Sequence, residues 1–240
     1  MQSAQTITLD QAKVRHDLAK TINILAMLGM DDLTYTHVSA RKPDNSGFFI
    51  NPFGTFFENV TADSLNEIPF AGADYEHSKT NKTGYRIHGD IYTAREDVNC
   101  IIHLHSPATI AVSAHKQGLL PLSQFSLHFY NKLHMHEYDG LVLQESQGES
   151  LASDLKDGVG MLLRHHGSLT VGTTIQEAFF YTYYLEQACK TQIQILSQGH
   201  DNIQKIPAET CARARDQMRT FEPDLGRRDW DALVRKLDKA

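Results

Sequence analysis

The chain has 240 residues, of which 41% are hydrophobic and 22% charged, a composition typical of one globular domain with a substantial core. Its formal net charge of −6 offers no basic excess, which argues against nucleic acid or an anionic membrane as a partner. No apolar run approaches the roughly 20 residues that cross a bilayer, and the first residues lack the apolar core of a secretory signal. Three widely spaced cysteines suggest no disulfide framework, so we expect a cytoplasmic protein.

The N-terminal segment predicts a helix followed by a strand. Thr8 and Gln11 have the spacing of a capping box, and apolar residues then recur at helical intervals, so a helix is expected over residues 9–28. Gly29 directly after them is suited to end that helix in the left-handed conformation. The apolar run 47–51, which a proline follows, predicts a strand.

The middle of the chain predicts further short elements. Residues 59–80 are polar and mixed, which indicates short strands and loop. Isoleucines four residues apart predict a helix over residues 84–94, and the alternating, β-branched segment 100–105 predicts a buried strand. Ser106 and the proline after it suit the N-cap and first position of another helix, closed by Gly118.

The last part of the predicted domain contains two strands and a long helix. Strands are expected over residues 160–167 and 168–171. Thr174 and Glu177 have the spacing of a second capping box, which opens a helix from about residue 175 to 197.

These elements favour one fold class. Helices and strands alternate, but several adjacent strands lie too close together for crossover helices. We therefore expect a single-domain α/β/α sandwich around a mostly antiparallel or mixed sheet, rather than a doubly wound parallel sheet. Residues 1–197 form this predicted domain, and residues 198–240 form a helical tail that packs on the domain or on a neighbouring subunit.

Histidine is the one residue type in excess, and its spacing suggests a metal site. His103 and His105 are separated by one residue on a predicted strand, so both side chains project from the same face. Two imidazoles at the end of a strand are a good start for a transition-metal site. Either His165 or His166, at the end of the second predicted strand, could complete a three-imidazole set that leaves positions open for water or substrate. The residues alone do not choose between these two.

Five segments together resemble the class II aldolase/adducin family, which includes fuculose-phosphate and rhamnulose-phosphate aldolases, ribulose-phosphate 4-epimerase and the adducin head domain. They follow the family order over about residues 10–197, and they are residues 33–41, 49–54, 60–65, 88–105 and 163–172. The resemblance implies that His103, His105 and His166 hold a divalent metal, with His165 as a structural or outer residue. The metal is zinc by analogy, although three imidazoles also suit iron(II) or manganese(II). The resemblance further implies a homotetramer with the site near a subunit boundary.

The chain departs from the aldolase pattern at the acid/base position. Gly84 stands where the sugar-phosphate aldolases carry a glutamate that transfers protons, and glycine has no side chain to do so. Phe125 falls near the position of their catalytic tyrosine, and the phosphate-binding loop is altered over residues 36–39. These changes resemble the adducin-like branch of the family, and they make a phosphorylated substrate doubtful.

Candidate replacements lie close to the altered positions. His37, Tyr85 and His88 are the candidate catalytic groups, with His37, expected on a loop, the best of them. The candidate substrate-binding residues are those that match ligand-holding segments of the relatives, Ser39, Asn51, Gly54 and Thr83. Structural roles are expected instead for the other polar residues near the site, which are Asp90, His128, His134, His136 and Tyr138.

The sequence therefore predicts a metal-dependent lyase or epimerase that acts on a small hydroxy-carbonyl, sugar-derived compound through a metal-stabilised enediolate. A non-catalytic adducin-like module for binding or assembly is the alternative. An iron-dependent oxygenase on the same fold is a weaker one. We favour an enzyme because three ligand histidines at strand ends would otherwise be retained without use.

Overall fold

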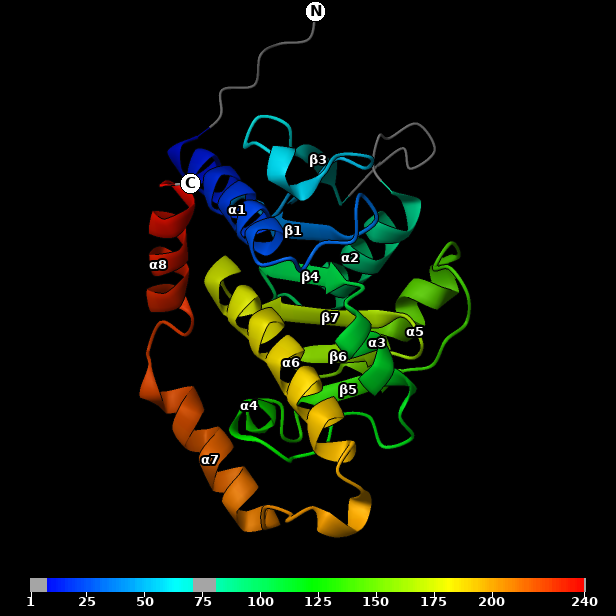
Figure 1. Cartoon of the computed structure of the whole chain (residues 1–240). Coiled ribbons are helices and arrows are strands. Elements are labelled where there is room, and N and C mark those ends of the chain that lie inside the picture. The colour runs from blue at the N-terminus through cyan, green and yellow to red at the C-terminus, as the bar shows by residue number, and fades with distance from the viewer. Residues whose placement is uncertain (1–7, 71–80, 240) are drawn as a thin grey trace, which may run out of the picture.

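A computed structural model describes residues 8–70 and 81–239 as a sheet of seven strands with helices on both faces (Figure 1). The strands are β1 (His37–Arg41), β2 (Gly47–Ile50), β3 (Asn66–Pro69), β4 (Cys100–Leu104), β5 (Leu133–His136), β6 (Gly160–Leu163) and β7 (Gly167–Gly172). The α-helices are α1 (Leu9–Met27), α2 (Lys82–Ala94), α3 (Pro107–Ala114), α4 (Gln124–Leu127), α5 (Glu145–Leu155), α6 (Ile175–Leu196), α7 (Ala208–Phe221) and α8 (Arg227–Leu237). Two short 3-10 helices are η1 (Phe57–Asn59) and η2 (His200–Asn202).

The strand order is β3-β2-β1-β4-β7-β6-β5, with β4 at the centre. All neighbouring pairs are antiparallel except β5 and β6, which are parallel. The expected α/β/α sandwich around a mostly antiparallel, mixed sheet is therefore confirmed.

Side chains alternate between the two faces of the sheet, and this alternation places His37 and His103 on the same face. On β4, Cys100 and Ile102 point into the cluster formed with α1, α6 and α8, while Ile101 points into the cluster formed with α2 and α5. Since successive side chains point to opposite faces, His103 lies on the α2 side with Ile101. On β1, His37 is the cross-strand partner of His103 and lies on the same side. The central strands thus present two histidines to α2.

Most predicted elements are confirmed. Helix α1 begins with the expected capping box at Thr8, and Gly29 follows it with a φ of +64°. Gly118 also has the expected positive φ, +63°, but it lies four residues after α3 ends at Ala114. Strands β2, β4 and β7 and helices α2, α3 and α6 lie where the patterns place them. The strand expected over residues 160–167 is shorter, because β6 ends at Leu163 and residues 164–166 form the turn to β7. The mixed segment 59–80 contains β3, and its residues 71–80 lie outside the described part of the chain.

Two local expectations are wrong. His37 lies on strand β1 rather than on a loop, because it pairs with His103 of the central strand. The second capping box is incomplete: Thr174 accepts a hydrogen bond from the backbone N–H of Glu177, but the Glu177 carboxylate accepts from the N–H and hydroxyl of Thr173 instead. Strand β5 and helices α4 and α5 were not predicted from the patterns.

The C-terminal helix packs on its own subunit. Trp230 of α8 is 4% exposed within the α1 cluster, and its Nε1 donates a hydrogen bond of 2.8 Å to Thr21 Oγ1. Lys20 of α1 also pairs with Asp238 just after α8. Among the described helices, none combines the length and apolar character that crossing a membrane requires.

Candidate metal centre

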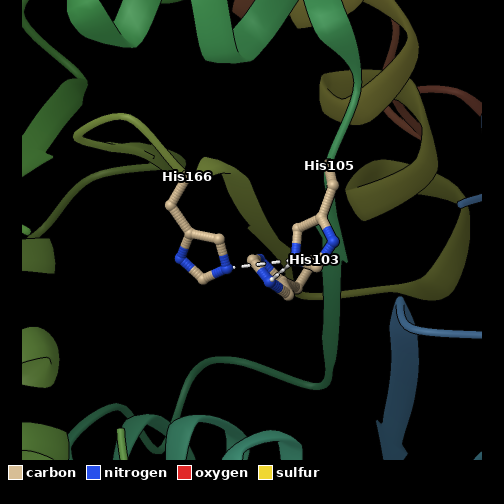
Figure 2. Close-up of side chains that lie close together, drawn as sticks. All are labelled: His103, His105 and His166. Carbon is tan, nitrogen blue, oxygen red and sulfur yellow. Dashed lines mark hydrogen bonds between the residues drawn. The ribbon is translucent and has the colours of Figure 1, made fainter. Parts of the chain in front are cut away.

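Three histidines converge from two neighbouring strand ends (Figure 2). His103 and His105 lie at the end of β4, and His166 lies in the turn between β6 and β7. Strand β7 pairs with β4 so that its first residues lie beside the end of β4. This approach requires glycine at position 167, where a Cβ would lie 2.3 Å from the Leu104 carbonyl oxygen. Strand pairing therefore brings His166 to the other two histidines.

The spacing of the three Nε2 atoms fits a single metal ion. His105 Nε2 lies 2.9 Å from His103 Nε2 and 3.0 Å from His166 Nε2. Imidazole nitrogens bound at 2.0–2.1 Å lie about 3.3 Å apart around a tetrahedral ion and about 2.9 Å apart at a right angle. The observed separations are close to these values. The three rings can therefore share one ion.

The hydrogen bonds on the far side of two rings fix their tautomers. His103 Nδ1 donates to the Ser168 carbonyl oxygen at 3.0 Å, and His105 Nδ1 donates to Asp32 Oδ2 at 3.0 Å. In each neutral ring the proton is then on Nδ1, so Nε2 carries a lone pair. Two lone pairs facing each other at 2.9 Å repel unless a positive charge lies between them. The donor set is that of a cation site.

Burial keeps two of these imidazoles, His103 and His166, neutral. It is the main cause that lowers the pKa of His103 well below its usual value, with the neighbouring histidines adding to the effect. Burial, and then the nearby His105 and His136, lowers the pKa of His166 to about 4. Both rings therefore offer unprotonated nitrogen near neutral pH, which is the form that binds a metal.

The structure separates the two adjacent histidines between which spacing alone could not choose, and it brings the one that the family resemblance implied, His166, to the other two. His165 has a φ of +56° at the tip of the turn, and its side chain is exposed. His166 is half-buried and joins the other two rings. A three-residue turn cannot direct two successive side chains to one point.

A buried chain of hydrogen bonds lies behind the histidine cluster. His37 Nδ1 lies 2.8 Å from His88 Nε2, His88 Nδ1 lies 2.5 Å from Ser39 Oγ, and Ser39 Oγ lies 2.8 Å from Tyr92 OH. The His37 ring also packs on His103, with 4.8 Å between centroids. Burial lowers the pKa of both His37 and His88 well below the usual value, so both rings are neutral.

The direction of this chain follows from its buried end. In the described part of the chain, Ser39 is the one hydrogen-bond partner of the Tyr92 hydroxyl, so Tyr92 donates to Ser39. Ser39 then donates to His88 Nδ1, and His88 Nε2–H donates to His37 Nδ1. The opposite direction would leave the buried tyrosine proton without an acceptor. His37 therefore carries its own proton on Nε2.

His37 occupies the space beside Gly84, the position that the family resemblance matches to a glutamate of the sugar-phosphate aldolases. A Cβ at Gly84 would lie 2.8 Å from His37 Cδ2 and 3.0 Å from His37 Nε2, so this imidazole leaves no room for a larger side chain on that part of α2. The His37 ring on β1 thus fills the space that a glutamate side chain at position 84 would need.

The four predicted substrate-binding residues lie in the middle of β1, just after β2 and at the start of α2. The Asn51 amide accepts from the Val38 N–H at 2.8 Å and donates to the Thr36 carbonyl, and Thr83 hydrogen-bonds to Asn81 at the N-cap of α2. Ser39 is fully buried in the relay described above. Gly54 lies in the turn after β2 with a φ of +81°. Apart from Gly54, which offers backbone alone, their polar groups are engaged within the protein.

The other candidates are spread over the molecule. Tyr85 is 5% exposed and lies in the apolar cluster beside Phe48. Asp90 faces α5, where a Cβ at Gly148 would collide with its carboxylate. His128 packs on two aromatic rings of α6.

Three further candidates lie on or near β5. His134 has a buried Nε2 without a hydrogen-bond partner in the described chain. His136 and Tyr138 line a cavity that His166 also lines. The Phe125 ring packs on Tyr184, on the side of α6 that also holds His128.

Asp32 is the residue of this site that sequence reasoning missed. It lies between α1 and β1, far from His105 in sequence, and it orients that ring. The one available signal was an acidic pair, Asp31 and Asp32, just before a segment that contains His37. The Ser168 carbonyl leaves no signal in the sequence, because every residue has one.

Comparisons with known proteins identify the family of this chain. Residues 16–193 match the family described as "Class II Aldolase and Adducin N-terminal domain". A Caulobacter vibrioides protein named "Putative aldolase class 2 protein" is 39% identical, over 95% of this chain and 90% of its own. Alpha-adducin from Rattus norvegicus is 32% identical over 99% of this chain but 35% of its own length. The crystal structure of an aldolase II superfamily protein from Pseudomonas syringae is 36% identical, with a TM-score of 0.90 over 97% of this chain and 95% of its own. The chain belongs to the class II aldolase and adducin N-terminal domain family.

Proposed function

We propose that this protein is a divalent-metal-dependent lyase or epimerase of the aldolase type, acting on a small hydroxy-carbonyl compound. The observation that carries the proposal is the convergence of three imidazoles, with His105 Nε2 2.9 Å from His103 Nε2 and 3.0 Å from His166 Nε2. The rings of His103 and His105 are oriented by hydrogen bonds to the Ser168 carbonyl and to Asp32. A divalent ion held there, with zinc as the expected metal, would act as a Lewis acid toward a carbonyl and its neighbouring hydroxyl. The family supports an aldolase-like reaction.

We propose that His37 acts on the substrate together with that ion. His37 is 4% exposed, and its Nε2 has no hydrogen-bond partner in the described chain. The relay through His88 holds its proton on this nitrogen. His37 is then a neutral hydrogen-bond donor that faces a substrate oxygen as negative charge develops there, a role that neutral imidazole can fill.

Metal binding is the first test. Protein purified without chelator should contain about one equivalent of divalent metal, measured by elemental analysis. His166→Ala should lose most of it, whereas the matched control His165→Ala should retain it, because that side chain lies outside the cluster. Equal metal content in the two variants would refute the proposed ligand set.

Catalysis requires a separate assay. The metal-loaded protein is incubated with aldoses, ketoses and hydroxy acids in D2O, and NMR follows cleavage, epimerisation and deuterium exchange beside the carbonyl. We expect exchange or turnover with at least one compound, and its loss in the His37→Gln variant with metal content unchanged. Loss of metal in His37→Gln would instead assign that residue to the structure of the site.

The adducin-like alternative rests on Gly84 and on the similarity to alpha-adducin. A non-catalytic module would keep the fold without depending on the ion. Metal-free protein that unfolds at the same temperature as the metal-loaded form, together with no deuterium exchange for any compound, would favour that alternative.

A further inference from the structure

A polar cavity opens beside His166, on the side of the metal centre away from His37. It has a volume of about 370 Å³ and lies between β5, the loop after it, and α5. His166 and His136 both line it. Because one wall is a histidine of the cluster, a molecule bound at the metal centre can extend into this cavity.

Carboxylates outnumber cations in the cavity wall. Glu137, Asp139 and Asp154 line it, and Arg164 is its one arginine or lysine. That guanidinium is already engaged: Nε donates to Glu137 at 3.3 Å, and Nη1 donates to the carbonyl oxygens of residues 113 and 115 at 2.8 Å each. The one guanidinium of the cavity thus directs three of its N–H groups to protein oxygens, and the carboxylates of Asp139 and Asp154 repel a phosphate.

The same wall offers groups that suit hydroxyls. His136 Nδ1 donates to Asp154 Oδ2 at 2.8 Å. This bond uses one nitrogen of the ring and one oxygen of the carboxylate, and leaves the other nitrogen and the other oxygen for a ligand. The hydroxyls of Tyr138 and Ser150 also line the cavity, and neither makes a hydrogen bond to another described residue. The wall of this cavity thus contains both hydrogen-bond acceptors and hydrogen-bond donors, and the cavity has the size of a small polyol.

On the opposite side of the site, the predicted substrate-binding side chains in the described part of the chain offer little for an anion. Ser39, Asn51 and Thr83, which match ligand-holding segments of the phosphate-using relatives, have their side-chain polar groups engaged within the protein. Both regions thus disfavour a phosphorylated substrate.

We infer that the cavity between β5 and α5 binds the neutral, polyhydroxylated end of an unphosphorylated substrate, with the His136–Asp154 pair and Ser150 as its hydrogen-bonding groups. This inference rests on the proposed function, which supplies the reacting centre at the three histidines. It assigns the substrate to unphosphorylated sugars and sugar acids rather than sugar phosphates.

Hydroxamates test the inference, because they chelate a metal through two oxygens. Three probes are compared by calorimetry on zinc-loaded protein: acetohydroxamate, a hydroxamate with a short polyol tail, and that compound with a terminal phosphate. We expect the polyol tail to bind about tenfold or more tightly than acetohydroxamate, as one or two hydrogen bonds to charged groups provide. The phosphorylated tail should bind no better than acetohydroxamate.

Two variants locate the effect. Asp154→Asn should remove most of the advantage of the polyol tail while leaving the affinity for acetohydroxamate unchanged, which also shows an intact site. Asp157→Asn is the matched control, because Asp157 lies just after α5, pairs with Lys132 and does not line the cavity.

The outcomes separate this inference from the proposed function. If acetohydroxamate does not bind the zinc-loaded protein, the proposed function fails, and the inference fails with it. If acetohydroxamate binds but the polyol tail adds no affinity, or if the phosphorylated tail binds tightest, only the inference is overturned. Equal losses in Asp154→Asn and Asp157→Asn would likewise overturn it.

Discussion

Replacing Gly84 by alanine tests whether His37 and this glycine form one packing unit. The added Cβ would lie 2.8 Å from His37 Cδ2, whereas non-bonded carbons prefer about 3.5–4.0 Å. The His37 ring cannot easily yield, because its Nδ1 is bonded to His88 and its face packs on His103. Gly84→Ala should therefore strain the ring that backs the metal centre.

Two opposing effects decide the magnitude. Alanine is favoured over glycine within a helix by about 1 kcal/mol. Overpacking a filled core costs about 1–3 kcal/mol. Gly84→Ala should therefore lower the free energy of unfolding by up to about 2 kcal/mol. It should also weaken metal binding, because displacement of His37 presses on His103.

Gly89→Ala is the matched control on the same helix. A Cβ there would lie 3.5 Å from the nearest atom of Tyr85, an ordinary contact, so the substitution should stabilise the protein. Urea unfolding and zinc competition with a chromophoric chelator measure both variants. The penalty of Gly84→Ala should also shrink in a His37→Ala background. Equal stabilities for the Gly84 and Gly89 variants would refute this packing argument.

Three other perturbations follow from the structure. Asp32→Ala, which removes the partner of a metal-site imidazole, should weaken metal affinity about 10–100-fold, whereas the neighbouring Asp31→Ala should not. Trp230→Phe, which removes the hydrogen bond to Thr21, should lower the free energy of unfolding by about 1–2 kcal/mol in urea melts. Burial raises the pKa of Asp90 from 3.8 to about 6, so the native state binds more protons than the unfolded state between these pH values. Stability from this group is thus lost as pH rises from about 4 to about 6, and Asp90→Asn should stabilise the protein at pH 7.5 by on the order of 1 kcal/mol.

Each of these three predictions would be refuted by a specific result. The role of Asp32 fails if its variant and the Asp31 variant bind metal equally well. Docking of α8 through Trp230 fails if the phenylalanine variant unfolds at the same urea concentration as the parent. The Asp90 account fails if the stability difference between parent and variant is the same at pH 4 and pH 7.5.

The fold could be predicted largely from local patterns. The capping box at Thr8, the left-handed Gly29 and the alternation over residues 100–105 are properties of a few adjacent residues, so the sequence displays them directly. Elements without such signals were missed. Strand β5 reads Leu-His-Met-His and helix α5 is rich in serine and glutamate, and both are stabilised by their neighbours rather than by their own composition.

By itself, the sequence determined that His103 and His105 share one face of a strand, because side chains alternate along an extended backbone. The spacing of residues did not choose which adjacent histidine joins them; the family resemblance pointed to His166, and the tertiary structure gives the physical reason, since the pairing of β7 with β4 places His166 beside that strand. Only the tertiary structure decided that Asp32 orients one ring and that His37 fills the space beside Gly84. These contacts join segments tens of residues apart, and hydrogen bonding and close packing between such segments depend on the folded arrangement of the whole sheet.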